Sequence, residues 1–234
     1  MAPTYPVISV IIPVWQEAAT IVATLQALKS VRHSGHEVIV VDGGSDDGTC
    51  ERAARYCDRV FVGEQGRAVQ MNKGAAEAKG DVLLFLHADT QLPSNAADRL
   101  GEFFQSSRHW GRFDVRLSEE RALFRLVSWL MNQRSWLTGI ATGDQAMFVR
   151  RSTFEDLGGF ANIPLMEDVE FSGRLKRVSR PYCISDPVVT DSRRWQREGA
   201  WRTILLMWRL RWRYWRGESP DQLAKVYQSD VRKP

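Results

Sequence analysis

The sequence predicts an α/β fold in which a mostly parallel central sheet is flanked by helices and followed by a C-terminal helical tail. Two observations support this prediction. Short runs of β-branched residues alternate with helical patterns between residues 7 and 100. These runs are continuously apolar, which is typical of strands covered on both faces, and the strand-helix-strand order favours parallel pairing with right-handed crossovers.

The first part of the chain contains four predicted strands, at residues 7–12, 37–41, 59–62 and 81–86, of which the last (D-V-L-L-F-L) is the most apolar. Predicted helices separate them at residues 17–29, 48–56 and 68–78. In the first helix Ile21, Leu25 and Leu28 share one face, as expected for a helix packed on a sheet.

After residue 110 the pattern is less regular. Strands are predicted at residues 112–117, 146–149 and 188–190, and helices at residues 122–136 and 167–178. Residues 201–216 contain neither Pro nor Gly and predict a long helix.

Length and composition fit one globular domain with appendages. The 234 residues are 44% hydrophobic and 26% charged, enough to bury one sizeable core. The three cysteines form no C-x-x-C pair, so neither a disulfide framework nor a zinc knuckle is expected. The apolar run from Val7 to Val14 is too short for a signal peptide or a membrane span. We therefore expect a cytoplasmic protein, soluble or peripheral on the inner face of the membrane.

The ends of the four predicted strands carry polar and glycine-rich elements. In open parallel sheets, ligands bind beyond the carboxyl ends of the strands. The elements are P-V-W-Q-E at 13–17, D-G-G-S-D-D-G-T at 42–49, Gly66-Arg67, and H-A-D at 87–89.

These elements and a later Glu167-Asp168 pair, in this order, resemble glycosyltransferase family 2, over residues 7–174. The H-A-D variant, the string G-D-Q-A-M-F-V-R-R at 143–151 and the Arg/Trp-rich tail also resemble a compact bacterial subgroup that family naming associates with arsenosugar biosynthesis. The resemblance implies a Rossmann-like GT-A fold. It also implies transfer of a sugar from a nucleoside-diphosphate sugar, with UDP favoured, to an acceptor hydroxyl.

The resemblance also suggests a division of the chain. Residues 1–198 would form the GT-A domain, with a nucleotide-binding half at 1–110 and an acceptor half at 111–198. Residues 199–234 would form an Arg/Trp-rich helical extension.

The donor site implied by the resemblance uses residues from all four strand ends. They are Pro13, Glu17, Asp42, Gly44, Arg67, Asn72, His87, Ala88 and Asp89. Asp42 would accept a hydrogen bond from a base N–H or a ribose hydroxyl; alternatively it caps the helix that follows. Arg67 would hold the diphosphate, or it is an ordinary exposed arginine.

A divalent cation is implied by the charge of a diphosphate leaving group. Asp89 supplies the oxygen ligand that Mg²⁺ or Mn²⁺ prefers. His87 stands where the family usually has the first aspartate of an Asp-x-Asp motif. It would contact ribose or bind the metal; alternatively, it is a strand-end histidine hydrogen-bonded to a loop.

The expected general base is Asp168, supported by Glu167, because the pair follows the G-G-F turn as in the family. The alternative is that both acids simply favour the N-terminus of their helix. One base without a second nucleophilic carboxylate implies inversion of configuration. Asp144, Gln145, Arg194 and Trp195 are expected on the acceptor side.

The tail carries a strong local charge excess. Residues 193–216 hold eight arginines, five tryptophans and one acid. On the predicted helix Arg202, Arg209, Arg213 and Arg216 form one stripe, and Trp201, Trp208, Trp212 and Trp215 form another, roughly 100° away. We expect the tryptophans either to contact an anionic membrane or to pack on the domain or on a second copy in a homodimer.

Two other functions are less consistent with the sequence. A sugar nucleotidyltransferase would usually carry a glycine-rich loop after the first strand, where this chain has P-V-W-Q-E. A non-catalytic nucleotide or nucleic-acid binder would explain the Arg/Trp tail but neither Asp89 nor Asp168. We therefore expect no nucleic-acid partner.

Overall fold

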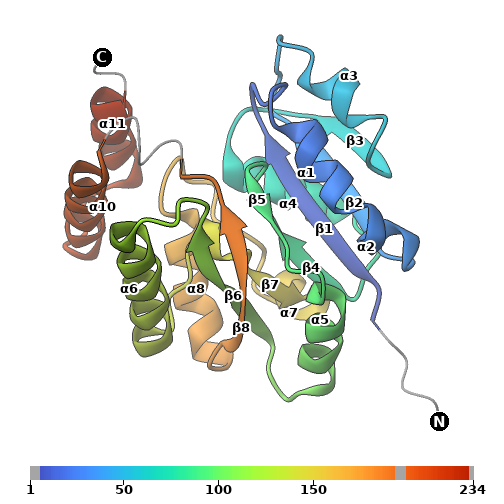
Figure 1. The fold of residues 1–234 in the computed structure, drawn as a ribbon. Coiled ribbons are helices and arrows are strands. Elements are labelled where there is room, and N and C mark those ends of the chain that lie inside the picture. Colours follow the sequence, from blue (N-terminus) through green and yellow to red (C-terminus); the bar gives the residue numbers. More distant parts are fainter. Residues whose placement is uncertain (1–5, 193–198, 232–234) are drawn as a thin grey trace.

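The computed structural model describes residues 6–192 and 199–231, and within them an eight-stranded sheet has the order β3-β2-β1-β4-β7-β6-β8-β5 (Figure 1). The strands are β1 (Ile8–Val14), β2 (Glu37–Asp42), β3 (Arg59–Val62), β4 (Val82–Phe85), β5 (Thr90–Gln91), β6 (Trp110–Leu117), β7 (Phe148–Arg150) and β8 (Tyr182–Thr190). The helices are α1 (Ile21–Ala27), α2 (Lys29–His33), α3 (Thr49–Ala53), α4 (Arg67–Glu77), α5 (Ala96–Gln105), α6 (Ala122–Thr138), the 3₁₀ turn η1 (Gly143–Gln145), α7 (Arg151–Asp156), α8 (Glu167–Val178), α10 (Ala200–Trp215) and α11 (Pro220–Val231).

The sheet is mostly parallel, as predicted. β1 lies between β2 and β4, and both pairs are parallel, as is β2 with β3. β7 enters antiparallel between β4 and β6, and β8 then pairs parallel with β6. β6 begins at Trp110, the last residue of the predicted nucleotide-binding half.

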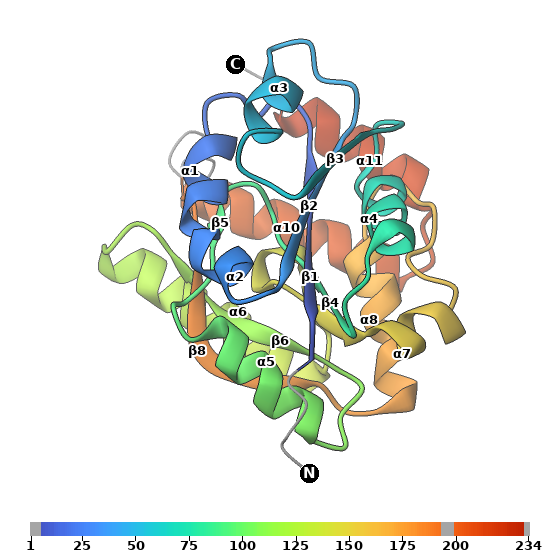
Figure 2. The same cartoon turned by 90° about the vertical axis from the view of Figure 1, so that its right-hand side faces the viewer.

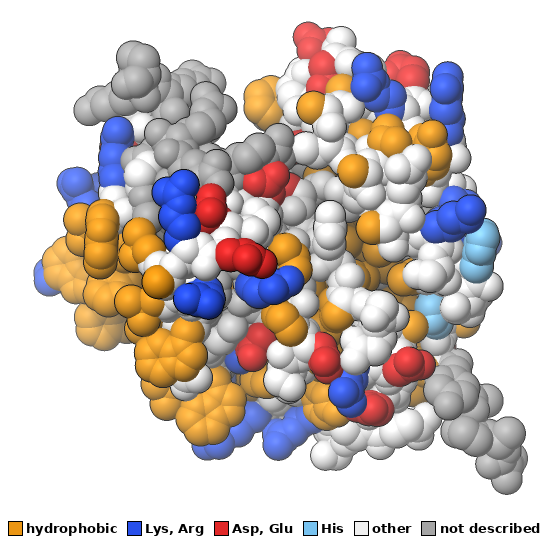
Figure 3. All heavy atoms as spheres, in the orientation of Figure 1, with side chains coloured by type: hydrophobic (Ala, Val, Ile, Leu, Met, Phe, Trp, Pro, Cys, Tyr) orange, Lys and Arg blue, Asp and Glu red, His pale blue; other side chains and the backbone are white. Residues whose placement is uncertain are grey.

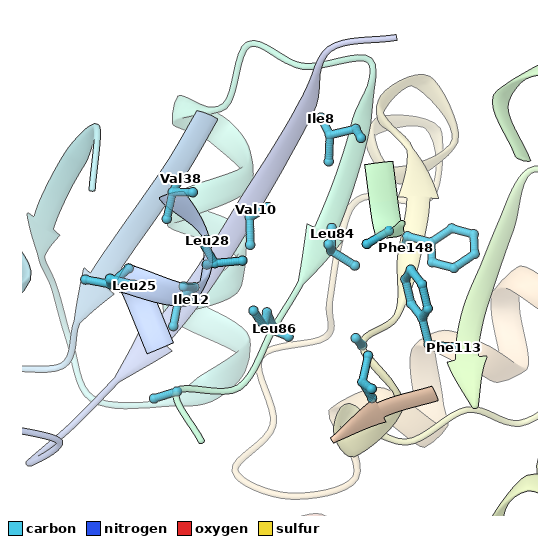
Figure 4. Packing of buried hydrophobic residues seen from close by; sticks show 14 of the residues in the cluster. Ile8, Val10, Ile12, Leu25, Leu28, Val38, Leu84, Leu86, Phe113 and Phe148 are labelled. Atoms are coloured by element: carbon cyan, nitrogen blue, oxygen red, sulfur yellow. The ribbon is translucent and has the colours of Figure 1, made fainter. Parts of the chain in front are cut away.

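Helices cover both faces of the sheet, which explains the continuous hydrophobicity of its strands. Val10 and Ile12 of β1 point to the core shared with α1, α3 and α5, whereas Ile11 points to the core shared with α4, α7 and α8. Figure 2 shows these two helical layers on opposite sides of the strands. Figure 4 shows how Leu25 and Leu28 pack beside β1 and β2 in the first core.

Several boundaries differ from the prediction. The expected helix 17–29 starts only at Ile21, because residues 17–20 form a turn in which the carbonyl of Glu17 accepts from the amides of Thr20 and Ile21. β7 starts at Phe148 because Ala146 adopts a left-handed conformation, with φ of 44°. The short elements β5 and α7 and the longer helices α5 and α11 were not predicted.

The C-terminal helices form an antiparallel pair beside α6 (Figure 1). Leu206 and Leu210 of α10 pack with Leu223 of α11 and with Met166, the residue before α8. In the part of the chain that the structure describes, no helix is long and apolar enough to cross a membrane.

Candidate active site

A pocket of about 320 Å³ lies at the carboxyl ends of β1 and β4 and at the start of α4. Six of the predicted site residues line it: Pro13, Glu17, Arg67, His87, Ala88 and Asp89. Trp15, half exposed, also lines it and was not among the predicted site residues. The carboxyl ends of the strands thus bring together residues up to 76 positions apart in sequence, from Pro13 to Asp89.

Asp42 is the last residue of β2 and is only 1% exposed. β2 is the neighbour of β1, whose end lines the pocket, but Asp42 itself is not part of the lining. Its Oδ1 accepts from the amide and hydroxyl of Ser45, at 3.0 and 2.7 Å. Its Oδ2 is buried without a hydrogen-bond partner in the described chain. A buried carboxylate oxygen normally has a donor, so Oδ2 is free to accept one from a ligand. Gly44, two residues on, has a φ of 85°, which favours glycine.

The start of α4 is held in place by Gln70. Its Nε2 donates to the carbonyls of Val14 and Val41 at 2.7 and 2.8 Å, and its Oε1 accepts from the amide of Gly66. This positions Arg67 at the first turn of α4. Asn72, by contrast, uses both ends of its amide on the backbone of Phe160, at 2.8 and 2.9 Å, and does not line the pocket.

The η1 turn brings Asp144 to His87. The Nδ1 of His87 lies 3.4 Å from Oδ1 of Asp144. A Cβ on Gly143 would lie 2.4 Å from Nε2 of His87, so only glycine allows this approach. Partial burial opposes ionisation of Asp144, but His87, Arg67 and Arg211 outweigh it and lower the pKa of Asp144 to about 2. Gln145, fully buried, bridges the amide of Thr142 and the side chain of Asn132.

Asp168 occupies the first turn of α8 and is held by two backbone amides. Gly143 donates to its Oδ2 at 2.8 Å and Val169 to its Oδ1 at 2.7 Å. Glu167 beside it is buried, and burial together with the charge of Asp168 raises the pKa of Glu167. The two adjacent acids therefore differ in their environments, as expected where they have different roles.

Backbone strain is concentrated around these elements. Among the described residues, three other than glycine have positive φ: Gln16 at 57°, Ala146 at 44° and Met166 at 70°. Gln16 follows β1 beside the pocket, Ala146 follows η1, and Met166 precedes Glu167. Such conformations cost about 1–3 kcal/mol each and cluster at functional sites.

Asp89 fits a divalent cation that is also held by a substrate. Asp89 lines the pocket, and the hydroxyl of Thr90 donates to its Oδ1 over a long distance, 3.3 Å. Within residues 6–192 and 199–231 no group of three or more His, Cys, Asp or Glu side chains is arranged to bind a metal ion. One carboxylate suffices where diphosphate oxygens and water complete the shell. The ring nitrogens of His87 face the η1 turn instead.

Two arginines at the site were missed by the sequence argument. Arg134 of α6 and Arg211 of α10 both interact electrostatically with Asp144 and Asp168. Arg211 lies outside the predicted arginine stripe. Its position on the opposite side of α10 could have indicated that it faces the domain. The predicted acceptor residues Arg194 and Trp195 lie outside the described residues.

The family model for glycosyl transferase family 2 matches residues 9–158. An undecaprenyl-phosphate 4-deoxy-4-formamido-L-arabinose transferase from Pseudomonas fluorescens is 32% identical over 168 residues, 62% of this chain and 47% of that protein. The probable glycosyltransferase YdaM of Bacillus subtilis is 26% identical over 242 residues, 91% of this chain and 55% of its own. The chain thus spans about half the length of these relatives.

Solved structures share the fold. A mannosyltransferase from Pyrobaculum calidifontis, in complex with GDP-Man and Mn²⁺, aligns with a TM-score of 0.60 at 23% identity, over 81% of this chain and 57% of that one. A TarS fragment from S. aureus, in complex with UDP-GlcNAc, aligns with a TM-score of 0.61 at 18% identity, over 80% of this chain and 59% of that one. The predicted GT-A fold is confirmed.

Proposed function

The chain belongs to glycosyltransferase family 2 and is a glycosyltransferase, and we propose that it transfers a sugar with inversion from a nucleoside-diphosphate sugar, UDP-linked by preference, to an acceptor hydroxyl. The observation that carries the proposal is the η1 turn, which joins the donor pocket to Asp168. On one side Asp144 pairs with His87 of the pocket, and on the other Gly143 donates to Asp168. This turn supports a donor site and a base that lie next to each other.

The donor half of the site is proposed from the pocket and the strand beside it. Asp42 would accept a hydrogen bond from the base or ribose, and Arg67 would contact the diphosphate. Desolvation lowers the pKa of Arg67, but the nearby carboxylates of Glu167, Asp144 and Asp168 outweigh it and raise that pKa, so its guanidinium stays charged. A divalent cation on Asp89 would supply positive charge to the departing diphosphate.

The chemical step is a displacement at the anomeric carbon. Asp168 accepts the proton of the acceptor hydroxyl while the hydroxyl oxygen forms its bond to that carbon. The bond from the carbon to the diphosphate breaks, and its electron pair leaves with the nucleoside diphosphate. Because Asp168 is held by Gly143 and Val169, it is positioned as an acceptor of this proton.

The experiment is to incubate the protein and Mn²⁺ with UDP-, GDP- and dTDP-sugars and to measure release of nucleoside diphosphate. Because slow hydrolysis releases the same product, the test needs no known acceptor. Release from at least one donor, abolished by Asp168→Asn, is expected. A parallel incubation also contains pyrophosphate. If the protein forms UTP from UDP-sugar and pyrophosphate there, it is a nucleotidyltransferase and the proposal is wrong.

We also propose that α6 and α10 contact an anionic membrane surface. Large apolar side chains are exposed on both helices: Leu126, Trp129, Leu130, Trp136, Leu137, Trp201, Leu205, Trp208, Trp212 and Trp215. Ile204 of α10 packs on the core under α6, and Figure 3 shows hydrophobic side chains gathered over the two helices with Lys and Arg beside them. Neither helix contains an acid. Arg209 of α10 and Arg216, the residue after this helix, are exposed beside this apolar area, a combination that is typical of an interfacial surface.

Sedimentation with vesicles tests this surface. The protein should bind vesicles that contain phosphatidylglycerol more strongly than vesicles of phosphatidylcholine alone. Trp208→Ser with Trp212→Ser should weaken that binding, whereas Val62→Ser, at an exposed position on β3, should not. A doubled sedimentation mass without vesicle binding would show that the surface joins two copies instead.

A further inference from the structure

Two partly buried arginines near Asp168 have buried donor nitrogens that lack hydrogen-bond partners in the described chain. In Arg134 the Nε and Nη2 atoms, and in Arg211 the Nε atom, are shielded from solvent and have no partner in the described chain. Neither side chain takes part in any of the ion pairs found within the described residues. Buried polar atoms are normally paired, and guanidinium donors left without acceptors are costly.

The two guanidiniums are close enough to repel each other. Burial and the charge of Arg211 lower the pKa of Arg134, whereas Asp168 and Asp144 raise it. Among the described residues neither arginine forms an ion pair with Asp168 or Asp144. The oxygens of Asp168 instead accept from the amides of Gly143 and Val169. Two like charges close to each other, with unpaired donor nitrogens, suit an anion with several oxygens.

The donor diphosphate is not the best candidate for this anion. Arg67 lines the donor pocket, whereas Arg134 and Arg211 are absent from its lining. They come from α6 and α10, which belong to the second half of the chain and its C-terminal extension. The anion is therefore expected near Asp144 and Asp168 but outside the lining of the donor pocket, which is where we place the acceptor.

We propose that Arg134 and Arg211 form a subsite for a phosphate group carried by the acceptor. This proposal rests on the proposed function and defines its acceptor as a phosphate-bearing molecule. With the phosphate held by both guanidiniums, a hydroxyl of the same molecule faces Asp168. The phosphate belongs either to a soluble metabolite or to a lipid; both carry the same oxygens for the two arginines.

The test is calorimetric titration of inorganic phosphate into the protein saturated with UDP and Mn²⁺, so that the donor pocket is already filled. The wild type should bind phosphate, and Arg134→Gln and Arg211→Gln should each weaken it about tenfold or more, the usual effect of losing a charged hydrogen bond. Arg177→Gln, an exposed arginine at the end of α8, is the control and should bind phosphate normally.

The same variants are titrated with UDP, whose affinity should change less than about twofold if the arginines serve the acceptor. Equal losses of UDP and phosphate affinity would assign the arginines to the diphosphate and overturn the proposal. So would unchanged phosphate affinity in both Gln variants. If a Gln variant does not fold, Arg134→Lys and Arg211→Lys keep the charge but lose the planar fork, and should bind phosphate more weakly than wild type.

Competition then identifies the source of the phosphate. Glucose 6-phosphate displaces bound phosphate if the acceptor is soluble, and vesicles containing phosphatidic acid displace it if the acceptor is a lipid. If neither displaces it, the site does not take an organic phosphate and the proposal fails. Phosphate binding needs no sugar transfer, so this result remains distinguishable from a failure of the proposed function.

Discussion

The backbone amide of Gly143 donates to Oδ2 of Asp168 at 2.8 Å, and the same glycine leaves room for the ring of His87. One residue of the η1 turn therefore sets the position of the proposed base and of a pocket side chain. Any change in this turn should affect both halves of the site.

Gly143→Ala tests this link. The added Cβ would lie 2.4 Å from Nε2 of His87, so the ring or the turn must move, at a cost of about 1–3 kcal/mol in the free energy of unfolding. Turnover should fall, because Asp168 loses its orientation. Gly173→Ala is the control: its Cβ would meet nothing within 4 Å inside α8, so it should be neutral or stabilising by up to about 1 kcal/mol. Equal activity of both variants would show that the turn does not position the base.

Asp144 should contribute to the stability of the fold in a pH-dependent way. Its pKa is lowered from 3.8 to about 2 in the folded protein, so the unfolded chain binds more protons between these values. Its stabilising effect is present above about pH 4 and is lost as the pH falls toward about 2. Asp144→Asn should therefore lower the thermal unfolding midpoint at neutral pH, and the difference from wild type should shrink below about pH 4. A difference that stays constant over this range would contradict the pairing with His87 and the arginines. Asp156→Asn, at an exposed position on α7, should show no such trend.

Replacing Asp42 should reduce the affinity for the nucleotide. Because its Oδ2 is buried and unpaired in the described chain, a ligand donor would complete its hydrogen bonding. Asp42→Ala should weaken nucleoside-diphosphate binding by about 1–3 kcal/mol in calorimetry. Ser45→Ala, which removes the hydroxyl that donates to Oδ1 of Asp42 and accepts from the amide of Gln16, should have a smaller effect. Equal affinities of Asp42→Ala and wild type would exclude Asp42 from the nucleotide site.

We expect Asp89 to be responsible for the metal dependence of nucleotide binding. Wild type should bind UDP more tightly with Mn²⁺ than without it, and Asp89→Ala should bind UDP equally in both conditions. Asp81→Ala is the control. Asp81 is exposed and lies before β4, at the end of the strand opposite to Asp89, so this variant should keep the effect of Mn²⁺ on UDP binding. A metal effect retained in Asp89→Ala would place the cation on other residues.

The sheet and the strand-end residues were predictable because both depend on local pattern. Continuous apolar runs indicated strands covered on two faces, and the residues after β1 and β4 meet in one pocket. The start of α1 was not predictable from periodicity, since Ile21 and Leu25 fit a helix that also includes Glu17. The turn at Glu17 depends on a contact with the start of α3, where the hydroxyl of Thr49 accepts from the amide of Glu17.

The arginines of the site were not predictable because they depend on tertiary packing. Arg211 is partly buried near the start of α8 because α10 packs through Leu206 and Leu210 onto Met166. The tryptophans of the same helix, by contrast, remain exposed, with Trp208 at 64% and Trp212 at 57%. Helical spacing predicted an arginine stripe and a tryptophan stripe, but it did not show which part of the helix would face the domain.

The most direct test of the account is the turnover and product stereochemistry of Asp168→Asn. Asparagine keeps the shape of the side chain but removes the proton acceptor, so turnover should fall by about 10²–10⁴ while nucleotide-sugar affinity changes little. Wild-type product formed from an α-linked donor should be β-linked. Near-normal turnover of Asp168→Asn, or an α-linked product, would contradict the assignment of Asp168 as the base of an inverting transfer.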